Sequence, residues 1–487
     1  MVALTALAVA ATLSAAPPAQ AAVASAPFAD APLPFTFATT GWTIVDLPEG
    51  LKPYQATTPP GFADPKPHTT AGVRTFVRNG VTYDHPQSQA ALGLSMLDGY
   101  RLTKDKRYLT IALANAQRLV DTKVVDSTVV SDGAWFFPYK FAFPLHGYPA
   151  VTMTPPWYSS MAQGQALDLF TRLSVVTGDT AWRTAADRTF ASFLIGNRST
   201  GPWVTEKDAD GHVWLEEYAA PTAKPAPDHT FNGHNFAISG IYEYYELTKD
   251  PRSLALIDGA MTASLAHLPQ IRQSGWISHY CLDHPEILST GYHAIHIRQL
   301  VWFHQFTNDT RFVRWADMLQ NDYPAPAATG VVYLVRGSHK AYVFDKHGGL
   351  VRSKTISLTR LSSAPLDQRK KIYRRAGYYY EITAGSLKGM FLREVPGSQY
   401  LLGARTLIAY PTVRTIALAA GAKVSAVATD GAGLIAHSGS LTYASVTRFT
   451  ISGRGIVNGV DRVRIAEGRW KGWWLTTSQV TLDAPTA

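Results

Sequence analysis

The sequence predicts a mainly α protein, an (α/α)4-type α/α toroid followed by two tandem all-β modules. Two observations support this fold class. Residues 85–325 contain four similar segments, each with an aspartate between two helix-like stretches. Residues 326–487 lose the helical period and consist of short apolar runs bounded by Gly, Ser and Pro. A straight solenoid of helical hairpins is the alternative to a toroid.

The first 84 residues precede the repeats. Residues 1–21 form a short apolar run that ends in Ala19-Gln20-Ala21, which is typical of a signal peptide and its cleavage site. We therefore expect a secreted, extracellular protein. Residues 22–84 are rich in Pro, Ala and Thr and are expected to be an irregular lead-in with a few short strands.

The four repeated segments read YRLTKDKRYL, SVVTGDTAWR, YELTKDPRSL and HQFTNDTRFV. An aspartate in this position accepts hydrogen bonds from the free N–H groups at the start of a helix, so each segment predicts a tight turn and a capped second helix. The result is four helical hairpins over residues 85–325. The predicted caps are Asp105, Asp179, Asp250 and Asp309.

A second repeat marks the C-terminal part of the chain. The stretch that starts at Gly337 aligns with the stretch at Gly421, and I-T-A-G-S-L-K-G-M-F-L from Ile382 aligns with I-A-E-G-R-W-K-G-W-W-L from Ile465. The offsets are 84 and 83 residues. We therefore expect β modules over residues 326–405 and 406–487. Their aromatic and basic residues suggest binding to a surface or polymer, while a simple role in the core is preferred for Trp470, Trp473 and Trp474.

The net charge of +9 is unevenly distributed. Residues 326–487 hold 22 Lys and Arg against 8 Asp and Glu, a balance of +14, and residues 1–325 hold 23 against 28, a balance of −5. A basic β tail favours contact with a polyanion such as an acidic polysaccharide or a cell-wall or matrix polymer; a surface that serves solubility is the alternative. No phosphate-binding or dinucleotide motif is found, and we expect no cofactor and no nucleic-acid partner. A homodimer stays open.

Polar and aromatic residues gather around the start of the first helix of each hairpin. If the hairpins run up and down in register, these four groups meet at one end and line a cleft suited to a carbohydrate. A solvated turn is the alternative for residues 216–218. The groups are Tyr83 and His85; Trp157, Tyr158, Gln163 and Gln165; Glu216, Glu217, Tyr218, Asn232, His234 and Asn235; and His279, Tyr280, Asp283, His284, Tyr292, His293 and His296.

Two other chemistries are weighed against this cleft. His279, His284, His293 and His296 could supply zinc ligands, but there is no H-E-x-x-H and no carboxylate at helical spacing, so we expect no metal. The single cysteine, Cys281, excludes a disulfide framework within the chain. A buried structural thiol is preferred to a nucleophile, because no general base is identified beside it.

Four stretches resemble the C-terminal domain of D-glucuronyl C5-epimerases: WYSSMAQGQAL at 157–167, EEYAAPT at 216–222, HNFAISGIYEYYEL at 234–247 and YHAIHIRQL at 292–300. The resemblance covers residues 80–322. It implies an α/α toroid that epimerises D-glucuronic acid residues of an acidic polysaccharide at C5. It also implies catalytic roles for Glu217, Tyr218, Tyr280 and Tyr292.

The resemblance has one departure. Where the family has Y-D-L-R-H, with an arginine that binds the substrate carboxylate, this chain has Tyr-Cys-Leu-Asp-His, with Asp283 in place of the arginine. Residues expected to hold the substrate are Tyr83, Trp157, Tyr158, Gln163, Gln165, Asn235, His284, His293, His296 and Arg298.

The epimerase chemistry needs an acid/base group on each face of the sugar ring. We expect Tyr292 or Tyr280 on one face and Glu217 with Tyr218 on the other. An imidazolium from His293 or His296 would favour the Tyr292 phenolate. A polysaccharide lyase that begins with the same proton removal, a glycoside hydrolase, and a non-catalytic polysaccharide-binding protein are the alternatives.

Overall fold

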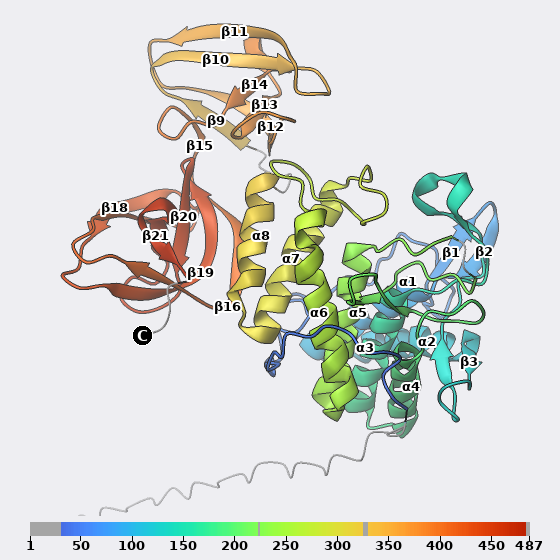
Figure 1. Cartoon of the computed structure of the whole chain (residues 1–487). Helices are drawn as coiled ribbons and strands as arrows, with labels where there is room; N and C mark the ends of the chain where they lie inside the picture. The colour runs from blue at the N-terminus through green and yellow to red at the C-terminus, as the bar shows by residue number, and fades with distance from the viewer. Residues whose placement is uncertain (1–30, 223–224, 325–329, 484–487) are drawn as a thin grey trace, which may run out of the picture.

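The computed structural model describes residues 31–222, 225–324 and 330–483, and the expected signal peptide, residues 1–21, lies outside them. A helical domain is followed by two separate β-sheet domains (Figure 1). Within the described residues, no helix combines the length and the apolar character needed to span a membrane.

The predicted helical hairpins are present. Each closing aspartate caps the second helix of its pair by accepting from a backbone N–H group two residues later, at 2.8–2.9 Å. The pairs are α1 (Pro86–Thr103) with α2 (Lys106–Thr122), α3 (Ser160–Thr177) with α4 (Thr180–Ala191), α5 (Phe231–Thr248) with α6 (Pro251–Ile271), and α7 (Thr290–Thr307) with α8 (Thr310–Asp322).

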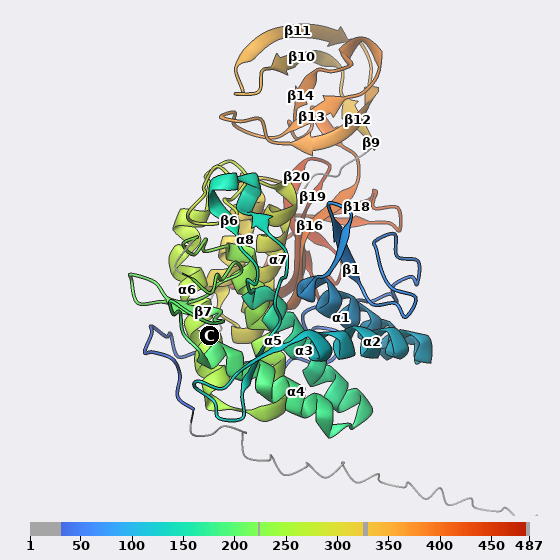
Figure 2. The ribbon, with the colours of Figure 1, turned by 90° about the vertical axis from the view of Figure 1, so that its right-hand side faces the viewer.

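The first helices of the hairpins form the inner row of the domain. α3 packs on α1 and on α5, and α5 packs on α7, while α2, α4, α6 and α8 each lie against their own partner (Figures 1 and 2). α3 and α5 approach closely because glycines face each other. A Cβ on Gly240 would lie 1.9 Å from the carbonyl oxygen of Gly164. The four inner helices, α1, α3, α5 and α7, all begin at the same end of the domain.

Short paired strands and 3-10 turns precede the first hairpin and connect the hairpins that follow. The strands are β1 (Thr75–Arg78), β2 (Val81–Asp84), β3 (Val124–Asp126), β4 (Ala134–Phe136), β5 (Phe143–Pro144), β6 (Thr152–Met153), β7 (Thr205–Lys207) and β8 (Val213–Leu215), paired in sequence order. The 3-10 turns are η1 (Leu145–Gly147), η2 (Pro149–Val151) and η3 (Ser192–Leu194).

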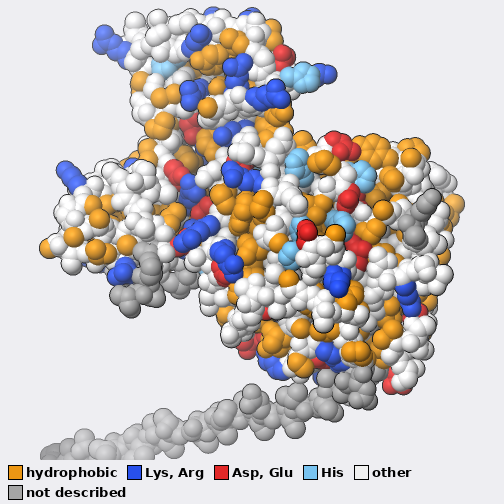
Figure 3. Space-filling view, viewed as in Figure 1, with side chains coloured by type: hydrophobic (Ala, Val, Ile, Leu, Met, Phe, Trp, Pro, Cys, Tyr) orange, Lys and Arg blue, Asp and Glu red, His pale blue; other side chains and the backbone are white. Residues whose placement is uncertain are grey.

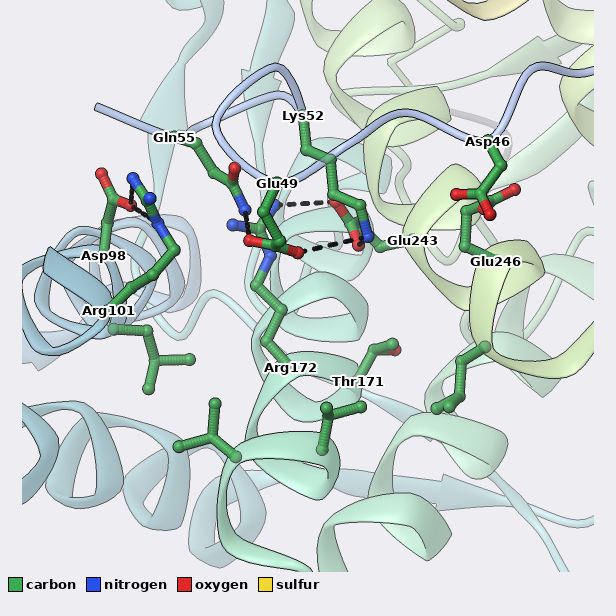
Figure 4. A pocket seen from close by; sticks show the side chains of 14 residues that line it. Asp46, Glu49, Lys52, Gln55, Asp98, Arg101, Thr171, Arg172, Glu243 and Glu246 are labelled. Atoms are coloured by element: carbon green, nitrogen blue, oxygen red, sulfur yellow. Dashed lines mark hydrogen bonds and ion pairs between the residues drawn. The ribbon is translucent and has the colours of Figure 1, made fainter. Parts of the chain in front are cut away.

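Residues 46–55 of the lead-in lie across the opposite end of the inner helices. There they help to form a cavity of about 520 Å³ (Figure 4). The charged side chains of this cavity are paired with one another: Lys52 lies 3.2 Å from Glu243, and Arg172 lies 3.1 Å from the same carboxylate. Tyr54 of the lead-in stacks on Phe236. This end of the helical row is therefore covered by the lead-in, and its buried basic residues are paired with carboxylates.

The C-terminal part contains two seven-stranded antiparallel sheets of identical strand order. The first runs β11-β10-β14-β13-β12-β9-β15 and the second β18-β17-β21-β20-β19-β16-β22, so each strand has a counterpart seven positions later. This topology agrees with the repeat read from the sequence. The strands are β9 (Gly330–Leu334), β10 (Gly337–Phe344), β11 (Leu350–Leu358), β12 (Ser362–Lys370), β13 (Tyr379–Ile382), β14 (Phe391–Arg393), β15 (Gln399–Leu401), β16 (Ala404–Leu418), β17 (Val424–Thr429), β18 (Ile435–Leu441), β19 (Thr447–Val457), β20 (Val460–Ile465), β21 (Trp474–Thr476) and β22 (Thr481–Leu482), with turns η4 (Gly385–Leu387) and η5 (Thr477–Gln479).

The two sheets relate differently to the helices. The first has its own apolar core, whereas the core of the second is continuous with that of the helical domain. Arg414 of β16 is buried between two carboxylates, 2.7 Å from Asp317 of α8 and 2.7 Å from Asp483. Removing either side of this junction would leave a buried charge without its partner.

The tryptophans of the second sheet divide between core and surface. Trp474 is buried, which agrees with a role in the core, while Trp470 and Trp473 are half-buried and pack edge to face at 4.9 Å. Lys and Arg side chains are spread over the face of the first sheet domain seen in Figure 3.

Candidate active site

A cavity of about 500 Å³ opens where the inner helices begin. Each inner helix contributes residues from its first turns, and the connecting loops add aromatic side chains. The structure thus brings the four polar groups of the sequence to one end of the domain. The lining residues are Phe76, His85, Gln87, Tyr139, Phe141, Phe143, Trp157, Ser159, Met161, Gln165, Glu217, Tyr218, Asn232, Phe236, Tyr292 and Ile295.

Three tyrosines form one connected group on the wall of this cavity. The hydroxyls of Tyr218 and Tyr280 lie 3.1 Å apart. The Tyr280 ring lies 4.5 Å from the ring of Tyr292, measured between centroids. Tyr292 is 39% exposed, so it is the end of the group that faces solvent. Burial, and then the nearby Glu217 carboxyl, raise the pKa values of all three phenols.

Glu217 extends this group into the interior. Its side chain lies beside Tyr218, and its Oε2 is buried without a partner. The carboxyl lies against Gly233 of α5, where a Cβ would come within 2.0 Å of Oε2. Burial, with the neighbouring carboxyls of Glu216 and Asp228, raises the pKa of Glu217 to about 8. The group is therefore a neutral acid at neutral pH that can ionise within the physiological range.

The adjacent Glu216 has a structural role instead. Its carboxyl group is fully buried and accepts from the backbone N–H of Tyr218 at 2.9 Å and of His229 at 3.0 Å; burial raises its pKa to about 8. These two bonds fix the turn that carries Glu217 and Tyr218. Glu216 therefore orients the turn, and Glu217 faces the cavity.

Asp283 does not point into the cavity. Its Oδ2 lies 2.8 Å from Nδ1 of His229, whose Nε2 lies 2.9 Å from Glu206. These carboxylates outweigh the effect of burial and raise the pKa of His229 to about 10, so the ring is an imidazolium at neutral pH. The negative charge of Asp283 is therefore neutralised outside the cavity.

The comparisons with known proteins concern the segment that carries most of this cavity. Residues 131–321 match the model of the D-glucuronyl C5-epimerase C-terminus. This segment is related to the C-terminal domain of D-glucuronyl C5-epimerases. The D-glucuronyl C5-epimerase of Caenorhabditis elegans is 26% identical over 202 residues. The matched part is 38% of this chain and 31% of that relative, so the chain spans less than a third of the relative's length.

Solved structures resemble the chain weakly. The Lin0763 protein of Listeria innocua matches with a TM-score of 0.34 and 14% identity over 49% of this chain and 60% of its own. Cellobiose 2-epimerase from Spirochaeta thermophila matches with a TM-score of 0.34 and 13% identity, over 62% and 66%.

The residues that resemble the family's motifs are distributed unequally around the cavity. Of the residues expected to bind substrate, Trp157 and Gln165 line it. Trp157 stacks on Tyr139 with ring centroids 3.9 Å apart, and Gln165 accepts from Nε2 of Gln87 at 3.2 Å. These aromatic and amide groups are the kind that contact sugar rings and hydroxyls.

Three other expected binding residues are parts of the interior. Tyr158 is buried against the ring of Phe136. Gln163 bonds the backbone of residues 135–137 through both ends of its amide, at 2.8 and 2.9 Å. Asn235 accepts from Ser264 at 2.6 Å. Their roles differ from the prediction because the same helix turns that line the cavity also face the neighbouring helices.

Three further predicted residues lie beside the cavity or away from it. Tyr83 packs on the ring of Phe141 but is not among the described residues that line the cavity. The guanidinium of Arg298 lies over Trp302 at 5.5 Å. His284 is turned toward Asp228, 2.6 Å from its carboxylate.

The expected imidazolium beside Tyr292 is not found. His293 and His296 are buried, and Nδ1 of each lies 2.9 Å from the hydroxyl of Ser278. Burial lowers the pKa values of both rings, that of His296 to about 3, so both are neutral. The sequence prediction was wrong here because Tyr292 and Ile295 line the cavity, whereas His293 and His296 leave α7 in other directions. His296, one turn deeper, packs against Phe231.

The four histidines considered as zinc ligands do not converge in the described part of the chain. Nδ1 of His279 lies 2.5 Å from the carbonyl of Pro285, and His284 bonds Asp228. The other two share the Ser278 hydroxyl.

Sequence reasoning missed several lining residues. Gln87, Tyr139, Phe141 and Phe143 all face the cavity. Three of them come from the loop between the first two hairpins, where AWFFPYKFAF is dense in aromatic residues. That density was the available signal, but nothing local shows which way such a loop folds.

Proposed function

We propose that the helical domain catalyses C5 epimerisation of D-glucuronic acid residues in an acidic polysaccharide. The observation that carries this proposal is the connected group Glu217–Tyr218–Tyr280–Tyr292. Both ends of this group, Glu217 and Tyr292, line one cavity. The hydroxyls of Tyr218 and Tyr280 lie 3.1 Å apart, and the rings of Tyr280 and Tyr292 lie 4.5 Å apart. The match to the D-glucuronyl C5-epimerase C-terminus supports the same reaction class.

The reaction breaks the C5–H bond of a uronate and leaves the electron pair delocalised into the carboxylate. Glu217 has the lowest pKa of the connected group, so its carboxylate is the first base to form and accepts this proton. Tyr292 then donates a proton to the opposite face of C5. Transfer from Glu217 through Tyr218 and Tyr280 restores Tyr292, so the proton balance closes without a cofactor.

Substrate recognition would rest on neutral groups. No Lys or Arg belongs to the described residues that line the cavity. The amides of Gln87, Gln165 and Asn232 would bond the sugar, with Trp157 as a stacking surface, and Oδ1 of Asn232 is buried without a partner. Because Glu217 is neutral before it acts as a base, it does not repel the carboxylate of an incoming uronate.

Further parts of the proposal concern the setting of the enzyme. The signal-like residues 1–21 support export to the extracellular space. The excess of 22 basic over 8 acidic residues in residues 326–487 supports contact between the β domains and a polyanionic polymer. A homodimer remains a proposal that the oligomeric state in solution would test.

The test is incubation of the full chain with glucuronic-acid polysaccharides in deuterated water, followed by NMR. Deuterium at C5 together with iduronate signals is expected. An unsaturated uronate product would replace the proposal with lyase chemistry, because the 4-oxygen would then leave instead of a proton returning to C5. No exchange with any uronate polymer would overturn enzymatic action on C5 and favour a binding protein.

A further inference from the structure

A second group of reactive side chains lies directly behind the tyrosines. Asp228 is fully buried and lies 2.9 Å from Nε2 of His146 and 2.6 Å from Nδ1 of His284. The thiol of Cys281 lies 3.7 Å from the same nitrogen of His146 and 3.9 Å from that of His284. All four potential ligand atoms lie within 4.8 Å of one another.

These four residues come from three separate segments. His146 belongs to the turn between β5 and β6, Asp228 precedes α5, and the remaining two flank a bend before α7. His146 has a left-handed backbone, with φ 53°, which a residue with a Cβ adopts at a cost. This conformation aims its ring at Asp228, so the surrounding structure holds the ring in place.

We propose that His146, Asp228, Cys281 and His284 form a zinc site. Two imidazoles, one thiolate and one carboxylate are the usual ligand types for zinc, and four protein ligands make a closed, structural site. The two anionic ligands balance the charge of the ion, so the buried site is neutral overall. This inference concerns a site separate from the acid/base group and does not depend on the proposed reaction.

The separations support this set of ligands. Tetrahedral zinc places sulfur and nitrogen ligands about 3.6 Å apart and nitrogen and oxygen ligands about 3.3 Å apart. The thiol–imidazole distances of 3.7 and 3.9 Å already lie near the first value. The carboxylate–imidazole distances of 2.9 and 2.6 Å need to open by about half an ångström. Binding therefore needs loss of the protons in these hydrogen bonds and a small side-chain movement.

The position of the site gives it a role for the neighbouring cavity. The ring of His146 packs against Tyr280 with centroids 5.4 Å apart and against Tyr218 at 6.2 Å. Zinc would tie the three segments together behind these phenols. The four ligands are then positioning residues, because they hold the tyrosines without contacting the substrate.

The other candidate clusters are weaker. Glu206, Glu216 and His229 offer three ligands and no sulfur. The same holds for the cluster of Asp208, His212 and His267. This cluster serves as the matched control because it has the same ligand types except the thiol.

The test is cobalt and zinc binding by the chelator-treated full chain. We expect one equivalent of zinc by mass spectrometry of metals. With Co²⁺ we expect tetrahedral d–d bands and a thiolate-to-cobalt charge-transfer band. Cys281→Ser should abolish the charge-transfer band, whereas His267→Gln should keep both the band and the metal. A wild-type protein that binds cobalt without a thiolate band, or binds none, would overturn the site.

Two further measurements keep this test decisive. If Cys281→Ser fails to fold, His284→Gln should weaken cobalt binding at least tenfold, and unchanged affinity in that variant would refute the assignment. Zinc should also protect the thiol of the wild-type protein from alkylation. Equal alkylation rates with and without zinc would count against the proposal. All of these readouts are independent of catalytic activity.

Discussion

The buried acid Glu217 should make the stability of the helical domain depend on pH. Its pKa of about 8 lies well above the usual value of 4.5 because burial disfavours the carboxylate. Between these two pH values the unfolded chain binds fewer protons than the folded protein. Stability therefore falls as pH rises through this window. A shift of 3.5 units at about 1.4 kcal/mol per unit gives a loss of about 5 kcal/mol.

Glu217→Gln removes this dependence, because the amide has similar size and never ionises. Relative to the wild type, the variant should gain stability by about 1.4 kcal/mol for each pH unit up to pH 8. Urea unfolding followed by circular dichroism at 222 nm, from pH 5 to pH 9, measures this difference. A difference that stays constant across the range would refute the buried, neutral carboxyl.

The control is Glu286→Gln, which removes an exposed carboxylate. Backbone hydrogen bonding and then the Tyr148 hydroxyl, at 2.9 Å, hold the pKa of Glu286 below its usual value. A carboxyl with a lowered pKa stabilises the fold above its usual pKa. The control should therefore lack the gain with rising pH that Glu217→Gln shows.

Three other substitutions test separate parts of the structure. Tyr292→Phe should lower C5 deuterium incorporation about 10²–10⁴-fold while Tyr333→Phe, in β9, leaves it unchanged; equal rates would remove Tyr292 from the chemistry. Gly240→Ala should destabilise the protein by about 1–3 kcal/mol in urea unfolding, because its Cβ would meet the α3 backbone at 1.9 Å, whereas Gly291→Ala has room and should be neutral or stabilising. The opposite order would contradict the close packing of α3 on α5. Arg414→Met should cost about 3–5 kcal/mol by the same assay, since two buried aspartates lose their partner, and a loss under 1 kcal/mol would mean that the junction is solvated.

Sequence patterns predicted the architecture because the interactions that define its hairpins join residues close together in the chain. The aspartate after each T-x-D turn caps its helix through a bond that spans two residues, so the hairpins could be read directly. The β repeat was readable for a similar reason, since two copies of one sequence pattern adopt one strand order. The agreement between residues 131–321 and the epimerase model then covers most of the cavity.

The details of the site depend on tertiary contacts and were less predictable. Tyr292 and His293 are neighbours, yet the first faces the cavity and the second bonds the end of α8, because their side chains leave the helix in different directions. Tyr218 was expected across the cleft from Tyr292, but a hydroxyl contact at 3.1 Å places it in the same group, through Tyr280. His146, from a connecting loop, carried no signal at all.

Asp283, which replaces the family's arginine, does not place its negative charge inside the cavity. Its charge is matched by the His229 imidazolium and lies outside the cavity. A positive potential for a uronate can come instead from the inner helices, which all begin at the cavity and carry a partial positive charge at that end. Neither Thr230 nor Ser289 caps its helix through its side chain, so α5 and α7 retain N–H groups for an anion. The helical row can thus supply from its backbone the attraction that the family obtains from one arginine.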